Sequence, residues 1–119
     1  MTLKELVDQS YGNSKAHGFH DNEEWIRIVP EKLMLIVSEL SEALEHYRNG
    51  NNQQPLNVIF ADLTSPSRSK PDGFAIELAD AIIRIGDLCG QLNIDLEEAV
   101  RIKMVYNATR PFKHGGKKC

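Results

Sequence analysis

Two matching pairs of acidic residues are the part of this sequence best suited to chemistry. Glu39 and Glu42 are separated by Leu-Ser, and Glu77 and Asp80 are separated by Leu-Ala. Residues three apart lie on one face of a helix, so each pair would hold its two carboxylates together. If the two faces turn toward each other, they offer four hard oxygen ligands. That is the kind of site that binds Mg²⁺.

A simpler interpretation of any one acidic pair is a solvated helix face. Two features favour a metal site here: the same step occurs twice, and Leu35, Ile76 and Ile83 extend the apolar surface onto or beside the acidic arc. A charge close to a core is costly unless it is paired or bound to a metal. Glu45 lies on a different arc and fits a solvated residue better, although it would serve as ligand or base if a second subunit faced it.

Four helices must position these acids. Capping residues and apolar spacing predict them at about 2–15, 30–48, 73–92 and 96–109. Thr2 and Asp95 are the expected N-caps of the first and fourth helices. Pro30 suits the first turn of the second helix, and Pro111 ends the fourth. The predicted fold class is therefore all-α, with the second and third helices antiparallel in a four-helix core.

The chain of 119 residues fits one domain, 1–119. Residues 50–72 form an irregular insert, which in so small a domain is usually functional or mobile. Its apolar patch, Leu56–Phe60, would dock on the core or on a partner subunit, or would form a lid. The tail at about 111–119 is predicted to be basic and flexible.

Apolar stripes on the two acidic helices predict the core. On the second helix the stripe comprises Leu33, Ile36, Val37, Leu40, Leu44 and Tyr47, and on the third it comprises Leu78, Ile82, Ile85, Cys89 and Leu92. The acids lie to one side of each stripe. Helices this apolar all round also predict burial by a partner chain, which means a homodimer at least and a homotetramer as an alternative.

The charge distribution bears on ligand and location. The net charge of -3 argues against general binding to nucleic-acid polymers, yet the last 19 residues hold six basic residues and no acidic ones. An acidic body with a basic end suits a ligand that carries both metal and phosphate. The two cysteines form no disulfide framework, and the chain lacks an apolar signal core or membrane-length run, so a cytoplasmic setting without membrane attachment is expected.

Three polar residues share one face of the predicted fourth helix. Lys103, Asn107 and Arg110 follow an i, i+4, i+7 pattern, in which Lys and Arg suit phosphate oxygens and Asn suits sugar or phosphate. The alternative is a solvated basic helix end that the helix dipole favours. Lys113, on the tail, is a further candidate phosphate contact.

Other polar and aromatic residues near the helices have competing interpretations. Trp25 is either core packing or, with His17 and Phe19, a wall of a pocket for a nucleotide base. His46 and Arg84 each follow an acidic step by four residues. A structural ion pair is the favoured interpretation of both, and contact with phosphate is the alternative.

These motifs together resemble the MazG-type all-α nucleoside triphosphate pyrophosphohydrolases. The family carries Glu-x-x-Glu on one helix and Glu-x-x-Asp on a later one, matched here by Glu39/Glu42 and Glu77/Asp80. Residues 103–110 resemble the family's Lys-x-x-x-Asn-x-x-Arg ending, so the match covers helices two to four and the tail. The insert at 50–72 is longer than a compact member of the family needs.

The resemblance implies an enzyme that hydrolyses a (deoxy)nucleoside triphosphate to the monophosphate and pyrophosphate, for nucleotide-pool sanitation or control. It implies a homo-oligomer that needs Mg²⁺, with Mn²⁺ as a substitute, and four acids that are both metal ligands and catalytic residues. The general base stays open. The candidate substrate-binding residues are Lys103, Asn107, Arg110 and Lys113, which lie in the matching segment and tail, and Trp25 as a candidate base contact. Alternatives are a non-catalytic nucleotide- or protein-binding module and a phosphoribosyl-ATP pyrophosphohydrolase.

Overall fold

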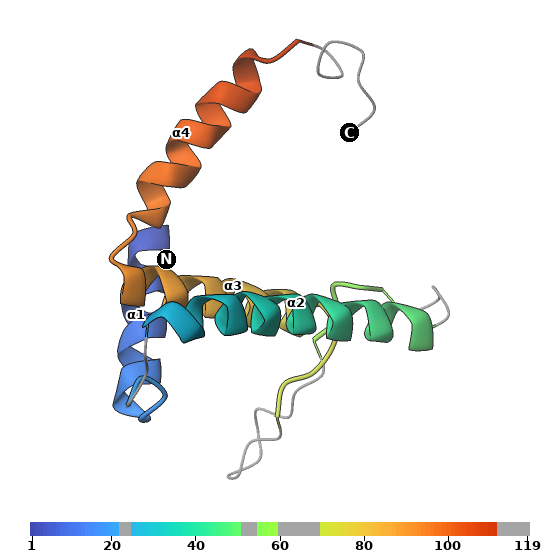
Figure 1. Ribbon diagram of the computed structural model, residues 1–119. Helices are drawn as coiled ribbons and strands as arrows, with labels where there is room; N and C mark the ends of the chain where they lie inside the picture. The colour runs from blue at the N-terminus through green and yellow to red at the C-terminus, as the bar shows by residue number, and fades with distance from the viewer. Residues whose placement is uncertain (22–24, 51–54, 60–69, 112–119) are drawn as a thin grey trace.

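The computed structural model describes residues 1–21, 25–50, 55–59 and 70–111, with the backbone alone at 25–27. Over these residues the regular structure is helical, which confirms the all-α class (Figure 1). The helices are α1 (Leu3–Ala16), α2 (Trp25–Asn49), α3 (Phe74–Leu92) and α4 (Leu96–Thr109). No helix of the described residues is long and apolar enough to cross a membrane.

Capping interactions fix the helix ends that the sequence predicts best. The Thr2 hydroxyl accepts a hydrogen bond from the Glu5 N–H at 3.0 Å, and the Asp95 carboxylate accepts one from the Glu98 N–H at 3.0 Å. Each bond satisfies an N–H group that has no partner within its own helix. At the other end of α3, Asn93 adopts a left-handed conformation with φ of 55°, which ends the helix.

The predicted start of α2 at Pro30 is wrong. The helix begins at Trp25, so Pro30 lies inside it and removes one hydrogen bond of the helix. Ile28 is buried in the turn before Pro30. Burial of that side chain holds the additional turn in place and offsets the missing hydrogen bond.

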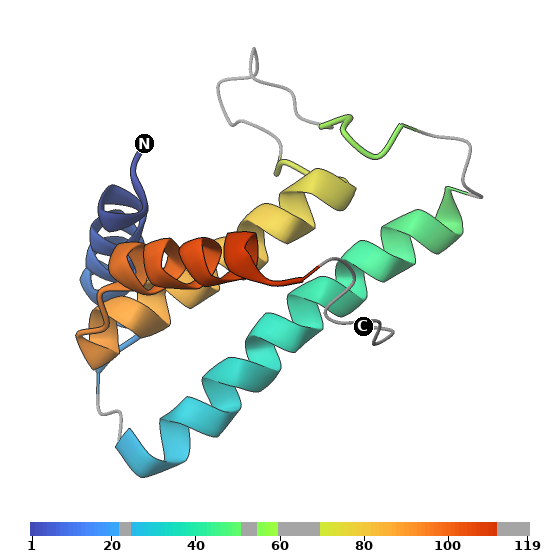
Figure 2. The same cartoon turned by 90° about the horizontal axis from the view of Figure 1, so that it is seen from above.

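Helices α1 to α3 form the body of the molecule. Helices α2 and α3 lie side by side and antiparallel, and α1 packs across α3 at a steep angle (Figures 1 and 2). Helix α4 extends away from the end of α3, and its main contacts within the described part of the chain are with α1. We call α4 the arm. The predicted four-helix core is therefore not complete within one chain.

Small residues let α1 approach α3 closely. A Cβ atom added at Gly90 would lie 2.3 Å from Cβ of Tyr11, and one added at Gly86 would lie 3.1 Å from Oγ of Ser10. Two backbones can come this near only where one side lacks a side chain. The glycines of α3 thus set the position of α1 against the body.

The predicted core stripe of α2 is wrong for a single chain, because five of its six residues are exposed and Ile36 is half-buried. The α3 stripe is confirmed in part: Cys89 is buried and Ile85 and Leu92 are half-buried, but Leu78 and Ile82 are exposed. We define the apolar face as the seven residues of the two stripes that are between 38% and 49% exposed: Leu33, Val37, Leu40, Leu44, Tyr47, Leu78 and Ile82. The buried contact between the helices instead contains Ala43, Ala81 and the acids Glu39 and Glu77. Small alanines allow close helix contact, and the larger residues turn outward together.

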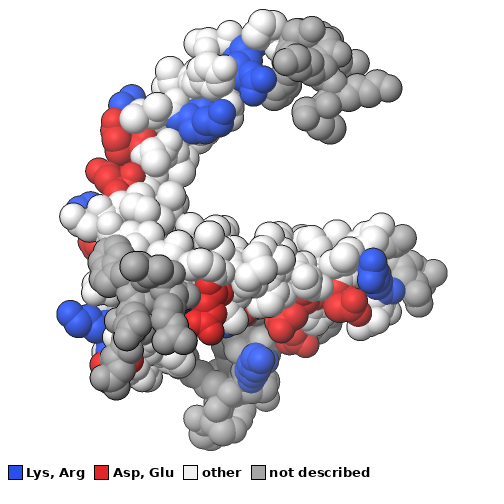
Figure 3. Space-filling model, viewed as in Figure 1, with Lys and Arg blue, Asp and Glu red and all other residues white. Residues whose placement is uncertain are grey.

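The apolar face borders the opening between the body and the arm. Figure 3 shows uncharged surface on the side of α2 next to this opening, and acidic side chains on the opposite side. The arm adds apolar residues of its own: Ile102, Met104, Val105 and Tyr106 are 54% to 65% exposed. One chain therefore leaves two apolar surfaces without cover from its described residues.

Little of the predicted insert lies within the described residues. Of the apolar patch Leu56–Phe60, Leu56, Val58 and Ile59 are exposed, and Phe60 lies outside the described ranges. The described part of the patch is thus not buried against the body.

Candidate metal centre

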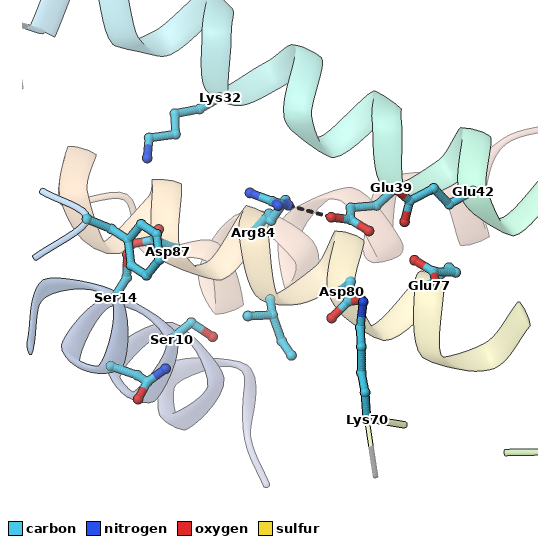
Figure 4. A pocket seen from close by; sticks show the side chains of 13 residues that line it. Ser10, Ser14, Lys32, Glu39, Glu42, Lys70, Glu77, Asp80, Arg84 and Asp87 are labelled. Carbon is cyan, nitrogen blue, oxygen red and sulfur yellow. Dashed lines mark hydrogen bonds and ion pairs between the residues drawn. The ribbon is translucent and has the colours of Figure 1, made fainter. Parts of the chain in front are cut away.

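The contact between α2 and α3 brings three of the four predicted acids together. Glu39 and Glu42 of α2 and Glu77 of α3 each place one carboxylate oxygen within 4.8 Å of the other two (Figure 4). Glu39 and Glu77 are buried, and Glu42 is exposed at the rim. The i,i+3 spacing and the antiparallel packing together produce the cluster that the sequence predicts.

Asp80 stands beside this cluster without belonging to it. It lines the same cavity, one turn after Glu77, and its side chain is directed toward Lys70 (Figure 4). Burial raises the pKa of Asp80, and the negative charge of Glu39 raises it further. The fourth acid is therefore in reach of the cluster but in a different electrostatic setting.

An ion pair holds Glu39 in place. Arg84 donates a hydrogen bond from Nε to Oε1 of Glu39 at 2.8 Å. Burial is the largest single effect and would raise the pKa of Glu39. The hydrogen bond and charge of Arg84, together with interactions with the Glu77 and Glu42 carboxyls, outweigh burial and leave that pKa below its ordinary value. Glu39 is thus a carboxylate at neutral pH.

The pKa of Glu77 is shifted in the opposite direction. Burial, followed by the neighbouring Glu42 and Glu39 carboxyls, raises the pKa of Glu77 to about 7. Its Oε2 atom is buried and accepts no hydrogen bond from the described residues. A buried carboxylate beside two others is unfavourable unless a positive charge compensates it. This arrangement fits a divalent cation.

A cavity of about 510 Å³ opens on these acids. Basic residues line it as well: Arg84 beside Glu39, Lys32 from α2, and Lys70 from the segment before α3 (Figure 4). The α1 side of the cavity is polar and contributes Ser10, Asn13 and Ser14. Acids, cations and neutral polar groups thus meet in one cavity.

Asp87 lines the cavity near α1 and pairs with a histidine of the segment after α1. His20 Nε2 lies 2.5 Å from Oδ1 of Asp87. The Tyr11 ring packs edge-on against the His20 imidazole, with 5.1 Å between the ring centres. These contacts tie the segment after α1 to α3.

The basic residues predicted on the fourth helix lie away from this cavity. Lys103, Asn107 and Arg110 are on the arm, and none of them lines the cavity. The Lys103 ammonium lies 4.8 Å from the centre of the Tyr106 ring, and the Arg110 guanidinium lies 5.6 Å from it. Within one chain, then, the arm and the acids do not form a common site.

The structure describes some of the remaining residues predicted to contact substrate. Lys113 and the side chain of Trp25 lie outside the described residues. Phe19 lines the cavity, and His17 is exposed, with Nδ1 2.8 Å from the Asn13 carbonyl oxygen. The predicted ion pair of Arg84 with an acid is confirmed, and His46 contacts the acids Asp72 and Glu77.

Two residues of the insert were missed as site residues. Lys70 lines the cavity, and Asp72 lies 3.0 Å from His46. Both immediately precede α3, the helix that carries Glu77 and Asp80. Charged residues just before an acid-bearing helix were the signal that could have identified them.

Comparison with protein-family models, curated proteins and solved structures finds no match to this chain. The interpretation of the site therefore depends on its own geometry. Three neighbouring carboxylates, one of which has an oxygen without a partner among the described residues, can hold a divalent cation. The basic side chains that line the same cavity can bind phosphate oxygens. Together they suit a ligand with several phosphate groups and a bound metal ion.

Proposed function

We propose that this protein is a MazG-like pyrophosphohydrolase, which hydrolyses a (deoxy)nucleoside triphosphate to the monophosphate and pyrophosphate. One observation carries the proposal: Glu39, Glu42 and Glu77 converge at a cavity that Lys32 and Lys70 also line. A metal-bound triphosphate needs acidic groups for the metal and basic groups for the phosphate oxygens, and this cavity is lined by both.

Glu39, Glu42 and Glu77 would hold Mg²⁺, for which Mn²⁺ can substitute. Held by these residues, the ion would supply activation of a water molecule and positive charge opposite the leaving pyrophosphate. Arg84 fixes the orientation of Glu39 through its 2.8 Å hydrogen bond. Lys32 and Lys70 would bind phosphate oxygens and keep the phosphate chain in line with the acids.

Asp80 is our candidate for the group that accepts the proton of the attacking water. It lines the cavity next to the cluster, and burial raises its pKa toward the range in which a general base works well. Glu45 is the weaker candidate, because it is exposed and does not line this cavity.

We also propose that the chain works as a homodimer. The residues of the apolar face and the apolar residues of the arm are exposed in one chain, and apolar side chains gathered on a surface mark a site of protein association. A second copy offers the same two surfaces and can cover both through one symmetric contact. In such a dimer the basic residues of one arm could line the cavity of the other chain, although they do not line the cavity of their own chain.

Pyrophosphate release from a panel of deoxynucleoside and nucleoside triphosphates, with and without Mg²⁺, tests the function. We expect turnover that needs Mg²⁺ and falls at least about 100-fold in Glu42→Gln, since that change removes one charge that binds the metal. Glu31→Gln is the matched control, an exposed acid on the same helix that does not line the cavity, and should retain wild-type turnover. Equal turnover in wild type and Glu42→Gln would refute the assignment.

A further inference from the structure

Glu77 has a second set of neighbours besides the acids of the cluster. His46 lies on α2, one turn after Glu42, and its Nε2 atom is 3.5 Å from Oε1 of Glu77. The same Nε2 atom is 3.0 Å from Oδ1 of Asp72, the residue before Gly73 at the start of α3. One ligand atom from each of the three residues lies within 4.8 Å of the other two.

These separations match the spacing of ligands around one metal ion. Nitrogen and oxygen ligands about 2.1 Å from an ion, at octahedral or tetrahedral angles, lie about 3.0 to 3.4 Å apart. The two distances from His46 Nε2 are 3.0 and 3.5 Å. The third separation, between the Asp72 and Glu77 oxygens, is within 4.8 Å, so the two carboxylates need to move closer together to share an ion with His46.

The burial of Glu77, which the two groups of ligands share, also favours a cation beside this residue. The Glu77 side chain is only 10% exposed, and its Oε2 atom has no hydrogen-bond partner in the described ranges. A buried carboxylate oxygen left without a partner is rare and unfavourable. A small cavity of about 180 Å³ opens beside it, lined by Glu42, Glu45, His46, Asn49 and Glu77.

We propose that His46, Asp72 and Glu77 form a second divalent-cation site, which takes a first-row transition-metal ion in preference to Mg²⁺. The imidazole nitrogen carries the selectivity, because Mg²⁺ prefers oxygen ligands whereas Mn²⁺ and heavier ions accept nitrogen readily. Glu77 would be shared with the cluster of Glu39 and Glu42, one carboxylate between two ions. This site goes beyond the proposed hydrolysis, and metal can bind there whether or not the protein has that activity.

Pulsed electron paramagnetic resonance of the full chain loaded with Mn²⁺ alone tests the site, because a coordinated imidazole modulates the Mn²⁺ echo through its ¹⁴N nucleus. We expect the nitrogen modulation in the wild type and its loss in His46→Ala, with one fewer Mn²⁺ bound per chain. His17→Ala is the matched control, since His17 is exposed and lies outside the site, and it should keep the modulation. Asp72→Asn should weaken Mn²⁺ binding at this site at least about tenfold.

Absence of nitrogen modulation in the wild type, or modulation that survives in His46→Ala, would overturn the proposal. Thermal unfolding of each variant without metal separates loss of the site from loss of the fold. The experiments can refute either proposal without refuting the other. Nitrogen-ligated Mn²⁺ in a protein without turnover supports the second site alone, and turnover without nitrogen ligation supports the hydrolase alone.

Discussion

Arg84 of α3 and Glu39 of α2 are 45 positions apart in the sequence, and their side chains meet at 2.8 Å on the wall of the cavity. Glu39 is buried, whereas the Arg84 side chain is 42% exposed. The pair therefore joins the two acid-bearing helices at the point where the cluster begins. It keeps one carboxylate charged and oriented before any ligand arrives.

This ion pair should be measurable by a double-mutant cycle of Arg84→Met and Glu39→Gln in urea unfolding. Because one partner is largely solvated, we expect a coupling of about 1 kcal/mol at pH 7, well below that of a fully buried pair. The pKa of Glu39 is depressed in the folded state, so this stabilisation is present above its ordinary pKa and is lost as the pH falls through the folded value. A coupling that persists at pH 2 would contradict the assignment.

Glu77 should make the metal-free protein less stable as the pH rises. Between its ordinary pKa of 4.5 and about 7, folded Glu77 keeps a proton that the unfolded chain has lost. The free energy of unfolding therefore falls across this window, by at most about 3 kcal/mol. Glu77→Gln should remove most of the decline and be more stable than wild type at pH 8 with a chelator present.

Addition of Mg²⁺ should make the wild type more stable than Glu77→Gln at pH 8. The ion compensates the Glu77 charge in the wild type and raises its thermal midpoint at pH 8, whereas Glu77→Gln should respond little. Thermal unfolding of both proteins, with chelator and with millimolar Mg²⁺, makes the comparison. An equal response of the two proteins to Mg²⁺ would remove Glu77 from the metal centre.

The close contact of α1 and α3 should be sensitive to one methyl group. Gly90→Ala places a Cβ atom 2.3 Å from Cβ of Tyr11, which no rotation of the Tyr11 side chain relieves, so we expect a loss of about 2–3 kcal/mol. Gly12→Ala in α1 is the control, with no atom within 4 Å of the added group, and should gain about 0.5–1 kcal/mol. Urea unfolding of both variants measures the difference, and a neutral Gly90→Ala would mean that the helices are farther apart.

The apolar face should control assembly. We expect Leu40→Lys to shift the chain from dimer to monomer in analytical ultracentrifugation, because it places a charge in the middle of the face. Ser38→Lys adds the same charge on another side of α2 and should remain dimeric. A monomeric wild type at micromolar concentration, or a dimeric Leu40→Lys, would show that this face is not the interface.

Local signals made the helices and the acidic cluster predictable. Thr2 and Asp95 bond to N–H groups three residues away, so the caps can be recognised without knowledge of the fold. The acid spacing is local too, and antiparallel packing of two similar helices was enough to bring Glu39, Glu42 and Glu77 together. Only the separation of Asp80 from the other three needed the tertiary structure.

Long-range packing decided what the sequence left open. The periodicity of α2 separates an apolar side from a polar one but does not say that Glu39 is buried and Leu40 is exposed. That outcome depends on the alanines that let α2 and α3 approach closely. Lys70 and Asp72 have no periodicity to place them, and the distance of Lys103 from the cavity follows from the direction of the arm.

The arm has one more consequence, which concerns protein concentration. A helix of 14 residues is close to the length at which an isolated helix is only marginally stable in water, and α4 gains little packing from its own chain. We expect its helicity to increase by mass action as copies associate, so that dilution melts α4 while α1 to α3 stay folded. The amount of protein made in a cell would then act as a threshold, below which the chain is present but its C-terminal helix is not formed.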